Sequence, residues 1–412
     1  MRVGRTLPPA AAPFKWVDLL HGVRGLFKGD RQRADLERDL KEYFGVKHVF
    51  CVNSGKTALT LILVALQRLS PRREVILPAY TCFSVPSAVV KAGLKVRLCD
   101  INASTFDYDF EQLSRQISAE TLCVVPTHLF GIPADMDRLL KLCRPYGVAV
   151  VEDAAQAMGG RDHGRWLGTI GDVGFFSLGR GKMITCGEGG VILTNSDCIA
   201  REIEKDYLQL GSAGISESFN EWLMVLAMAI LIRPSLYWLP AGMPMLKLGK
   251  TFFCQDFPLE RLSSMKVGLM THWRERLAES VSCRVHSAAS LQEGVNTLGS
   301  QKARLPFLRF PLLLESRRQR DAVFNASQGR GLGLSTMYPS ALSGIEEILD
   351  SVIDPECPVA TSVAQRLIAL PTHRHVTDQD RERIFSILKS STAETHAHPL
   401  QEGSEHLPLN VT

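Results

Sequence analysis

One stretch, residues 148–190, constrains the fold and chemistry of this chain more than any other. It opens with an apolar run over 148–151, which predicts a buried strand. Glu152 and Asp153 follow directly, and Gln156 comes three residues after Asp153. The sequence therefore predicts an acidic side chain at the end of a buried strand.

The second half of the stretch adds a hydroxyl group and an amine. An apolar run over 173–176 leads to Ser177, and Lys182 follows five residues later. Four glycines surround or follow this lysine: Gly181, Gly187, Gly189 and Gly190. An acid at a strand end, a hydroxyl and a lysine in a glycine-rich segment suit a buried anionic cofactor with a pyridine ring and a carbonyl group.

The order of these elements resembles one known family. The chain reads EDAAQA at 152–157, GDVGFFS at 171–177, lysine at 182 and GEGG at 187–190. This pattern is similar to that of the DegT/DnrJ/EryC1/StrS family of sugar aminotransferases, which depend on pyridoxal 5'-phosphate (PLP). The resemblance extends well over 30–210 and loosely over 256–390. It implies the aspartate-aminotransferase fold, also called fold type I.

Size and composition agree with a soluble enzyme and exclude several other classes. The 412 residues allow a large core and two domains, and 45% are hydrophobic. A net charge of +4 is too small to indicate a nucleic-acid partner. The ten cysteines form no C-x-x-C pair, so we expect neither a disulfide framework nor a metal site. The first 14 residues contain no secretory apolar run, so we expect a cytoplasmic location.

Apolar runs typical of strands alternate with helical patterns along most of the chain. This alternation predicts an α/β fold in which a mainly parallel, doubly wound sheet forms a large domain. A smaller α+β domain follows in the C-terminal part. Ligands of such sheets bind beyond the carboxyl ends of the strands. Ser54, the segment 78–83, His128 and Asp153 all follow predicted strands, so we expect them to converge.

The turn after the first strand is a candidate phosphate site. Ser54 and Gly55 separate that strand from a helix, and free backbone N–H groups at a helix N-terminus bind anions. Lys56 replaces a residue that is usually threonine in the family; it either adds a positive charge near the phosphate or points to solvent. Thr57 completes the turn. Taken alone, the turn would be an ordinary helix cap without a ligand.

The resemblance assigns roles to the residues of the central stretch. Lys182 would be the catalytic lysine that attaches PLP covalently, Asp153 would hold the pyridine nitrogen, and Gln156 would bond the ring oxygen or a group near it. Ser177 and the 54–57 turn would hold the phosphate. Each residue also has a structural interpretation: a loop lysine, a helix cap, a surface amide and a strand-end serine.

Three positions depart from the family pattern or stay open. Family members often stack an aromatic side chain on the cofactor ring; the matching position here is Cys82, next to Phe83. The partner-subunit asparagine that binds the phosphate in relatives is missing, because Leu259 and Glu260 precede the Arg-Leu-Ser motif. His128 is either a site residue or a hydrogen-bonded structural histidine. The expected cofactor-binding residues are Ser54, Gly55, Lys56, Thr57, Phe83, Asp153, Gln156, Ser177 and Lys182.

We divide the chain into four parts. They are an N-terminal arm (1–30), a large PLP-binding domain (31–255), a small C-terminal domain (256–390) and a disordered tail (391–412). An apolar insertion over about 212–255 lies in the large domain, and 222–232 contains no charge. A membrane-spanning helix takes roughly 20 apolar residues, so we expect this segment to be an enlarged dimer interface, a lid, or a peripheral membrane contact through 222–246.

The expected function is transfer of an amino group from an amino acid, with glutamate as the expected donor, to a keto sugar linked to a nucleotide. This chemistry serves amino-sugar or cell-surface polysaccharide biosynthesis. The expected partners are these two small molecules and a second copy of the chain. One alternative is a PLP-dependent sugar dehydratase; those relatives lack the lysine, so Lys182 counts against it. A second alternative is a non-catalytic, membrane-associated homologue.

Overall fold

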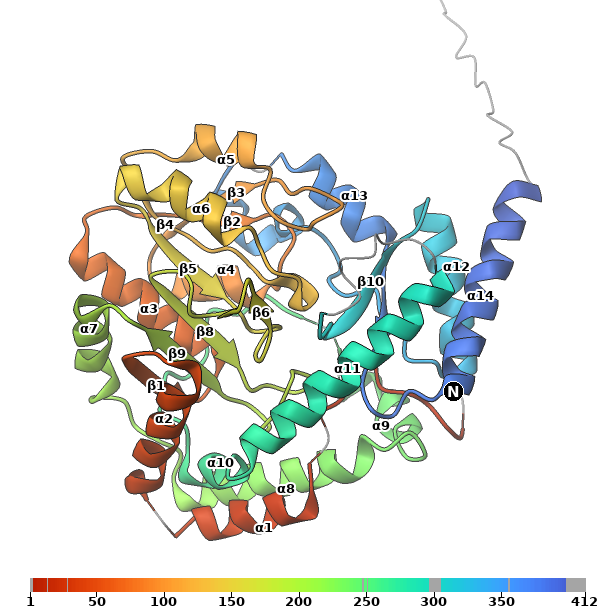
Figure 1. Cartoon of the computed structure of the whole chain (residues 1–412), viewed down its shortest axis with the longest axis horizontal. Coiled ribbons are helices and arrows are strands. Elements are labelled where there is room, and N and C mark those ends of the chain that lie inside the picture. The colour runs from red at the N-terminus through yellow and green to blue at the C-terminus, as the bar shows by residue number, and fades with distance from the viewer. Residues whose placement is uncertain are drawn as a thin grey trace, which may run out of the picture.

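An eight-stranded sheet forms the centre of the molecule (Figure 1). The computed structural model describes residues 3–12, 14–27, 29–246, 248–249, 251–295, 305–354 and 356–397. The strands lie in the order β1-β9-β8-β5-β4-β2-β3-β11. Their bounds are β1 (His48–Val52), β2 (Glu74–Pro78), β3 (Lys95–Cys99), β4 (Thr121–Val124), β5 (Ala149–Asp153), β8 (Val173–Ser177), β9 (Gly190–Thr194) and β11 (Val352–Ile353).

The sheet is mainly parallel, as the sequence predicts. All neighbouring pairs from β8 to β11 are parallel, whereas β9 runs antiparallel to both β1 and β8. The reversal at β9 has a local cause: only residues 178–189 separate β8 from β9, and they form no crossover helix. These same residues contain Lys182.

Helices cover both faces of the sheet. On β2, Ile76 packs with Leu113 and Leu139 of α5 and α6, while the neighbouring Leu77 belongs to a core that includes Leu61 of α3. This alternation is the packing of a doubly wound sheet. The helices are α1 (Trp16–Gly25), α2 (Asp30–Phe44), α3 (Gly55–Leu69), α4 (Ser84–Lys91), α5 (Phe110–Gln116), α6 (Met136–Cys143), α7 (Asp197–Tyr207), α8 (Ile215–Leu231), α9 (Trp238–Ala241), α10 (Ser264–Leu269), α11 (Trp273–Val295), α12 (Arg317–Arg330), α13 (Pro358–Arg366) and α14 (Asp378–Ala397).

The C-terminal part carries a second, two-stranded sheet. Strand β10 (Arg309–Leu313) pairs antiparallel with β12 (Leu367–Pro371). The final helix continues to Ala397, so the prediction of disorder is wrong for 391–397, and 398–412 lie outside the described residues. The domain boundary at 255 stays a prediction.

The N-terminal arm packs against its own chain. The Leu7 N–H donates to Gly331 O at 2.9 Å, and the buried His373 donates from Nε2 to Pro8 O at 2.8 Å. Gly333 has φ +71°, and a Cβ there would lie 2.8 Å from Leu7 O, so the close approach of the arm requires glycine. Figure 1 shows the N-terminus beside α14.

The uncharged run at 222–232 lies mostly in α8, which packs on α1 and α10 at one end of the molecule (Figure 1). The Trp222 indole N–H donates to Leu19 O of α1 at 3.1 Å, and Glu221 pairs with Lys266 of α10 at 2.6 Å. In the part of the chain that the structure describes, no helix has both the length and the apolar character needed to cross a membrane.

Candidate active site

The ends of four strands meet where the parallel sheet predicts. Thr127, just beyond β4, forms a bridge with Asp153 at the end of β5, and the His128 N–H donates to Asp153 O at 3.0 Å. At the other side, a Cβ on Gly55 would lie 3.3 Å from the Ser177 Cβ. The start of α3 therefore lies against the end of β8, and the carboxyl edge of the sheet gathers the predicted residues.

The turn at Ser54 has the geometry of an anion site. Ser54 caps α3: its hydroxyl oxygen accepts from the Thr57 N–H at 3.1 Å. Because the cap uses the Thr57 N–H, the backbone donors left for an anion are those of Gly55 and Lys56. The Ser177 hydroxyl oxygen accepts from the Gly179 N–H at 3.3 Å, which leaves the hydroxyl proton for an acceptor beside Gly55.

Lys56 and Thr57 have protein partners of their own. The Lys56 ammonium group lies 4.3 Å from the ring centroid of Phe257, in a cation–π contact. The Thr57 hydroxyl donates to Asn53 Oδ1 at 2.6 Å. The side chains of these two residues thus contact the segment around 257 and the end of β1. Their part in phosphate binding stays a prediction, and for Lys56 it would fall to the backbone N–H.

Asp153 is a buried carboxylate with spare hydrogen-bonding capacity. It is 4% exposed, and its Oδ1 accepts from the Ala155 N–H at 3.0 Å. Burial raises the pKa of Asp153, while the Ala155 N–H, Lys182 and His128 lower it. A buried carboxylate with one hydrogen bond from the described residues suits a cationic or N–H partner, such as a protonated pyridine nitrogen.

Gln156 follows Asp153 by three residues, and both its amide nitrogen and its amide oxygen form hydrogen bonds. Its Nε2 donates to the Tyr338 hydroxyl at 2.9 Å, and its Oε1 accepts from the Phe130 N–H at 3.2 Å. The amide keeps one N–H and one lone pair for a ligand. Tyr338 is a site neighbour that sequence reasoning missed, because 182 positions separate it from Gln156.

The hydrogen bonds of His128 indicate a structural role, because each ring nitrogen has a protein partner. Its Nδ1 accepts from the Ala134 N–H at 3.1 Å, so Nε2 carries the proton and donates to Glu152 Oε2 at 2.8 Å. Glu152 also accepts from the backbone N–H groups of Gly168 at 2.8 Å and Gly171 at 2.5 Å. Both ring nitrogens are therefore occupied, and the side chain braces the end of β5.

Lys182 lies half-buried in the segment between β8 and β9. Burial lowers the pKa of its ammonium group, Cys82 and Asp153 raise it, and Arg309 lowers it further. A lowered pKa increases the neutral, nucleophilic fraction of the amine. Gly181, with φ +69°, provides the preceding turn, and a Cβ there would lie 3.0 Å from the Cβ of Ala10.

Cys82 and Phe83 occupy different surroundings. Cys82 Sγ accepts from the Ser84 hydroxyl at 2.9 Å, lies 3.4 Å from Thr251 Oγ1 and acts electrostatically on Lys182. Phe83 is 7% exposed and lines a cavity of about 940 Å³. Cys82 thus lies within electrostatic range of Lys182, and the assignment of Phe83 to the cofactor stays a prediction.

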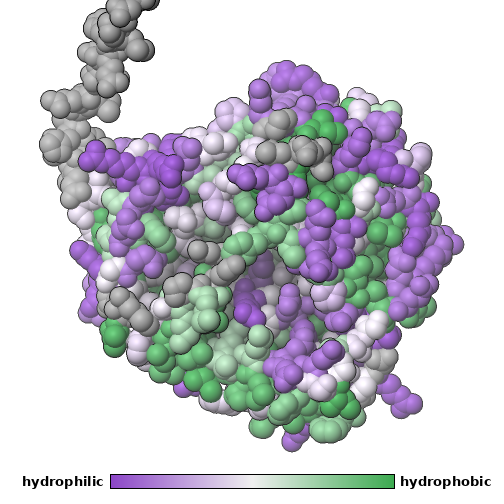
Figure 2. All heavy atoms as spheres, turned by 180° about the vertical axis from the view of Figure 1, so that it is seen from behind, coloured by the Kyte–Doolittle hydropathy of each residue, from purple (hydrophilic) through white to green (hydrophobic). Residues whose placement is uncertain are grey.

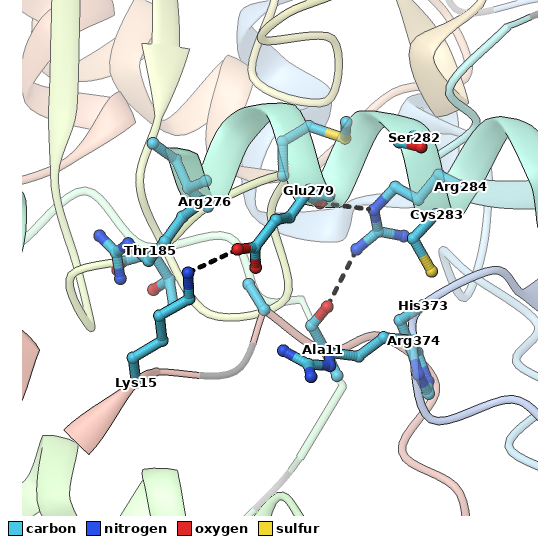
Figure 3. A pocket seen from close by; sticks show the side chains of 14 residues that line it. Ala11, Lys15, Thr185, Arg276, Glu279, Ser282, Cys283, Arg284, His373 and Arg374 are labelled. Atoms are coloured by element: carbon cyan, nitrogen blue, oxygen red, sulfur yellow. Dashed lines mark hydrogen bonds and ion pairs between the residues drawn. The ribbon is translucent and has the colours of Figure 1, made fainter. Parts of the chain in front are cut away.

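A second cavity, of about 400 Å³, lies behind the lysine segment and is walled in part by residues 183–185 (Figure 3). Lys15 pairs with Glu279 at 2.5 Å, and Arg284 donates to Ala11 O at 2.9 Å. Figure 3 shows these charged groups turned toward protein partners. We therefore place the candidate active site at Asp153 and Lys182 and not in this cavity.

The residues at the sheet edge fit PLP. The α3 N-terminus and Ser177 provide donors for its phosphate, Asp153 provides a carboxylate for its ring nitrogen, and Lys182 provides the amine for its aldehyde. Each group has the charge that its expected partner needs, and each side chain has capacity that the protein leaves unused.

Sequence comparison with known proteins identifies a family and several relatives. A sequence model of the DegT/DnrJ/EryC1/StrS aminotransferase family matches residues 23–229 and 260–389. The chain is 38% identical over 170 residues to the GDP-perosamine synthase of Caulobacter vibrioides, which is 41% of this chain and 46% of that protein. It is 26% identical over 369 residues, 88% of each chain, to the UDP-N-acetyl-3-dehydro-alpha-D-glucosamine 3-aminotransferase of Acidithiobacillus ferrooxidans. The first of these matches spans about half the length of the relative.

Solved structures show the same fold. A sugar aminotransferase of Micromonospora echinospora has a TM-score of 0.75 at 21% identity, covering 93% of this chain and 99% of that one. The E. coli GDP-4-keto-6-deoxy-D-mannose-3-dehydratase with bound hydrated PLP has a TM-score of 0.74 at 17% identity, covering 94% and 100%. The fold prediction is confirmed, and the family resemblance with it. This chain belongs to the DegT/DnrJ/EryC1/StrS aminotransferase family, a PLP-dependent family of fold type I.

Proposed function

We propose that this protein is a PLP-dependent aminotransferase that moves the amino group of an amino acid, with glutamate as the expected donor, to a keto sugar carried on a nucleotide. The observation that carries the proposal is a half-buried lysine with a lowered pKa, Lys182, which interacts with the buried carboxylate of Asp153. The nucleotide-sugar acceptor is supported by the names of the relatives at 38% and 26% identity.

The chain's own residues divide the work. PLP, when bound, supplies an electron sink for the bonds at the donor's α-carbon. Asp153 would hold the proton on the pyridine nitrogen, because a buried carboxylate is stabilised by a cationic partner. The neutral amine of Lys182 would accept the proton of the donor α-carbon and, once protonated, act as the proton donor. Gly55, Lys56 and Ser177 would hold the phosphate and so orient the cofactor.

The two alternatives have less support. A sugar dehydratase shares this fold, but the resemblance implies that dehydratases lack the lysine, and Lys182 is present. A non-catalytic homologue has no need of a buried acid and a lysine with a lowered pKa at one strand edge.

An absorbance spectrum tests the proposed function directly. We expect the purified protein to be yellow with PLP, and glutamate to replace the visible band with one at shorter wavelength while an equivalent of 2-oxoglutarate forms. Nucleotide-linked keto sugars added next should restore the visible band. A protein that stays colourless with added PLP would support the non-catalytic alternative, and release of water from the sugar without 2-oxoglutarate would support a dehydratase.

Beyond the site, we propose a homodimer, which forms through an apolar surface on α1 and α8. Phe219, Leu223 and Met224 of α8 are 48%, 44% and 63% exposed, and Trp16 and Leu20 of α1 are 57% and 61% exposed. Figure 2 shows hydrophobic residues along the end of the molecule where these helices lie. An exposed apolar patch of this kind marks a protein or membrane contact, and a second copy needs no further partner.

Charged substitutions on this surface distinguish a dimer interface from a membrane contact. We expect sedimentation to give a dimer for the wild type and a monomer for the double variant Leu223→Glu/Met224→Glu, because burying two carboxylates at an interface is unfavourable. Gln209→Glu, at an exposed polar position outside α1 and α8, is the control and should stay dimeric. If the wild type instead sediments with vesicles and the double variant does not, the surface is a membrane contact.

A further inference from the structure

The cavity of about 400 Å³ behind the lysine segment has a strongly basic wall. This wall combines the N-terminal arm, residues 183–185, α11 and the loop that follows β12 (Figure 3). Its cationic residues are Lys15, Arg276, Arg284 and Arg374, and Glu279 is the one acid among the described residues that line it. A cavity with such an excess of positive charge attracts anions.

Two of the four cations have a carboxylate partner of their own. Lys15 Nζ lies 2.5 Å from Glu279 Oε1, and Arg276 Nη1 lies 3.6 Å from Oδ2 of the buried Asp18. Even so, Arg276 Nε is buried and has no hydrogen-bond partner in the described part of the chain. Each ion pair is close to neutral as a unit, so the excess charge of the wall lies with the other two arginines.

Arg284 is a buried guanidinium group that no carboxylate of the described residues neutralises. It is 1% exposed, and burial lowers its pKa to about 10, so it stays charged at neutral pH. It donates to four neutral oxygens: the backbone oxygens of Ala11 and Leu308 and the hydroxyl oxygens of Ser280 and Thr372. A buried charge without an opposite charge is costly, and an anionic ligand would offset this cost.

Arg374 contributes a second positive charge without a partner. Its side chain is exposed, and within the described ranges of the chain it forms no hydrogen bond or ion pair. The neighbouring His373 adds no charge, because burial and repulsion from Arg284 lower its pKa to about 3. The wall therefore offers two uncompensated positive charges, and a dianion would balance them.

We propose that this basic cavity binds a phosphate dianion, either free or as a monoester. A phosphate group carries up to two negative charges at neutral pH, and a planar guanidinium group matches its oxygens with paired hydrogen bonds. The volume of about 400 Å³ falls within the range of small-molecule sites, so it accommodates a phosphate with an attached group of sugar size. Ser280 and Ser282 provide hydroxyl groups in the wall for such a group.

The basic cavity is separate from the expected cofactor site but touches the segment that carries Lys182. Neither Gly55 nor Ser177, the donors expected for the cofactor phosphate, lines it. Residues 183–185 line it directly after Lys182, and Arg276 Nη1 donates to the Thr185 O at 3.3 Å. A bound phosphate would therefore stabilise the lysine segment, and the melting temperature should rise with phosphate concentration.

Calorimetric titration of the PLP-loaded protein tests this proposal, because bound PLP already occupies the cofactor's own phosphate position. The probes are inorganic phosphate and glucose 6-phosphate at constant ionic strength, with glucose as the uncharged control. We expect one phosphate group to bind per chain and glucose not to bind. Glucose 6-phosphate should bind more weakly at about pH 5 than at about pH 8, because its second pKa is near 6 and it loses one charge below it. Tighter binding of glucose 6-phosphate than of phosphate would identify the ligand as an ester, and equal affinities would identify it as free phosphate.

Two variants place the bound phosphate in the basic cavity. Arg374→Glu should raise the Kd at least about 10-fold, because it changes the charge by two units at an exposed position. Arg284→Lys should also raise the Kd, since the charge stays but the forked donors are lost. Arg383→Glu, at an exposed arginine of α14 outside the cavity, is the matched control and should leave the Kd unchanged.

The result does not depend on the proposed function, because no reading requires transfer of an amino group. If neither probe binds the wild type, the proposal is overturned. The same holds if Arg374→Glu binds both probes as tightly as the wild type does, which would place any bound phosphate elsewhere. Arg374→Glu decides the question alone should Arg284→Lys fail to fold, since an exposed side chain is replaced there.

Discussion

Lys182→Ala should abolish covalent attachment of PLP and lower turnover by at least about a thousandfold, the upper range for loss of a proton-transferring group. In the wild type, borohydride should fix the cofactor on the peptide that contains Lys182. The physical reason is that burial lowers the pKa of Lys182, so that its amine is neutral more often, whereas Lys56, the other lysine predicted at the site, lies in a cation–π contact with Phe257.

The control for this variant is Lys205→Ala, an exposed lysine on α7 that pairs with Glu202 at 2.7 Å. It removes the same side chain far from the site and should leave the spectrum and turnover unchanged. A visible band that survives in Lys182→Ala and can still be fixed by borohydride would show that another lysine binds the cofactor. In that case the assignment of the whole 177–190 segment would need revision.

Asp153→Asn should lose most turnover, about 100- to 10,000-fold, while still binding some PLP. An amide does not hold the proton on the pyridine nitrogen, so the electron sink weakens, whereas the phosphate donors at Gly55 and Ser177 are untouched. Single-turnover conversion by glutamate, followed in the visible band, measures this loss. Asp197→Asn, at an exposed acid, is the control.

Asp153→Asn should lower turnover but should not lower the stability of the cofactor-free protein. Burial raises the pKa of Asp153 in the folded protein, so the native state binds a proton more readily than the unfolded chain does. The free energy of unfolding therefore falls as pH rises from the pKa of Asp153 in the unfolded chain to its raised pKa in the folded protein, and the loss stays constant at higher pH. We expect cofactor-free Asp153→Asn to melt at the same temperature or higher at pH 7. A variant with near-normal turnover would mean that a different residue contacts the ring nitrogen.

The positions of several site residues could be predicted from the sequence alone. Ser54, Asp153 and Ser177 come at the ends of strands, and strands β1, β5 and β8 run in the same direction. Parallel strands place their carboxyl ends at one edge, so the order of apolar runs and polar residues is enough to predict that these side chains gather.

Other features depend on segments that are distant in sequence. The hydrogen bonds of His128 decide its role, since Ala134 and Glu152 occupy both ring nitrogens. Tyr338 reaches Gln156 only because the C-terminal part folds back over the sheet edge. The arm at 3–12 packs against residues 331–333 of its own chain.

By itself, the sequence determined the α/β class, the family and the set of polar residues at the sheet edge, because strand order and periodic burial depend on local pattern and on topology. The tertiary structure decided what surrounds them. It brought Tyr338 to Gln156 and placed Arg309 in the wall of the cavity that Phe83 also lines. These outcomes depend on contacts between segments more than a hundred residues apart, which no local pattern encodes.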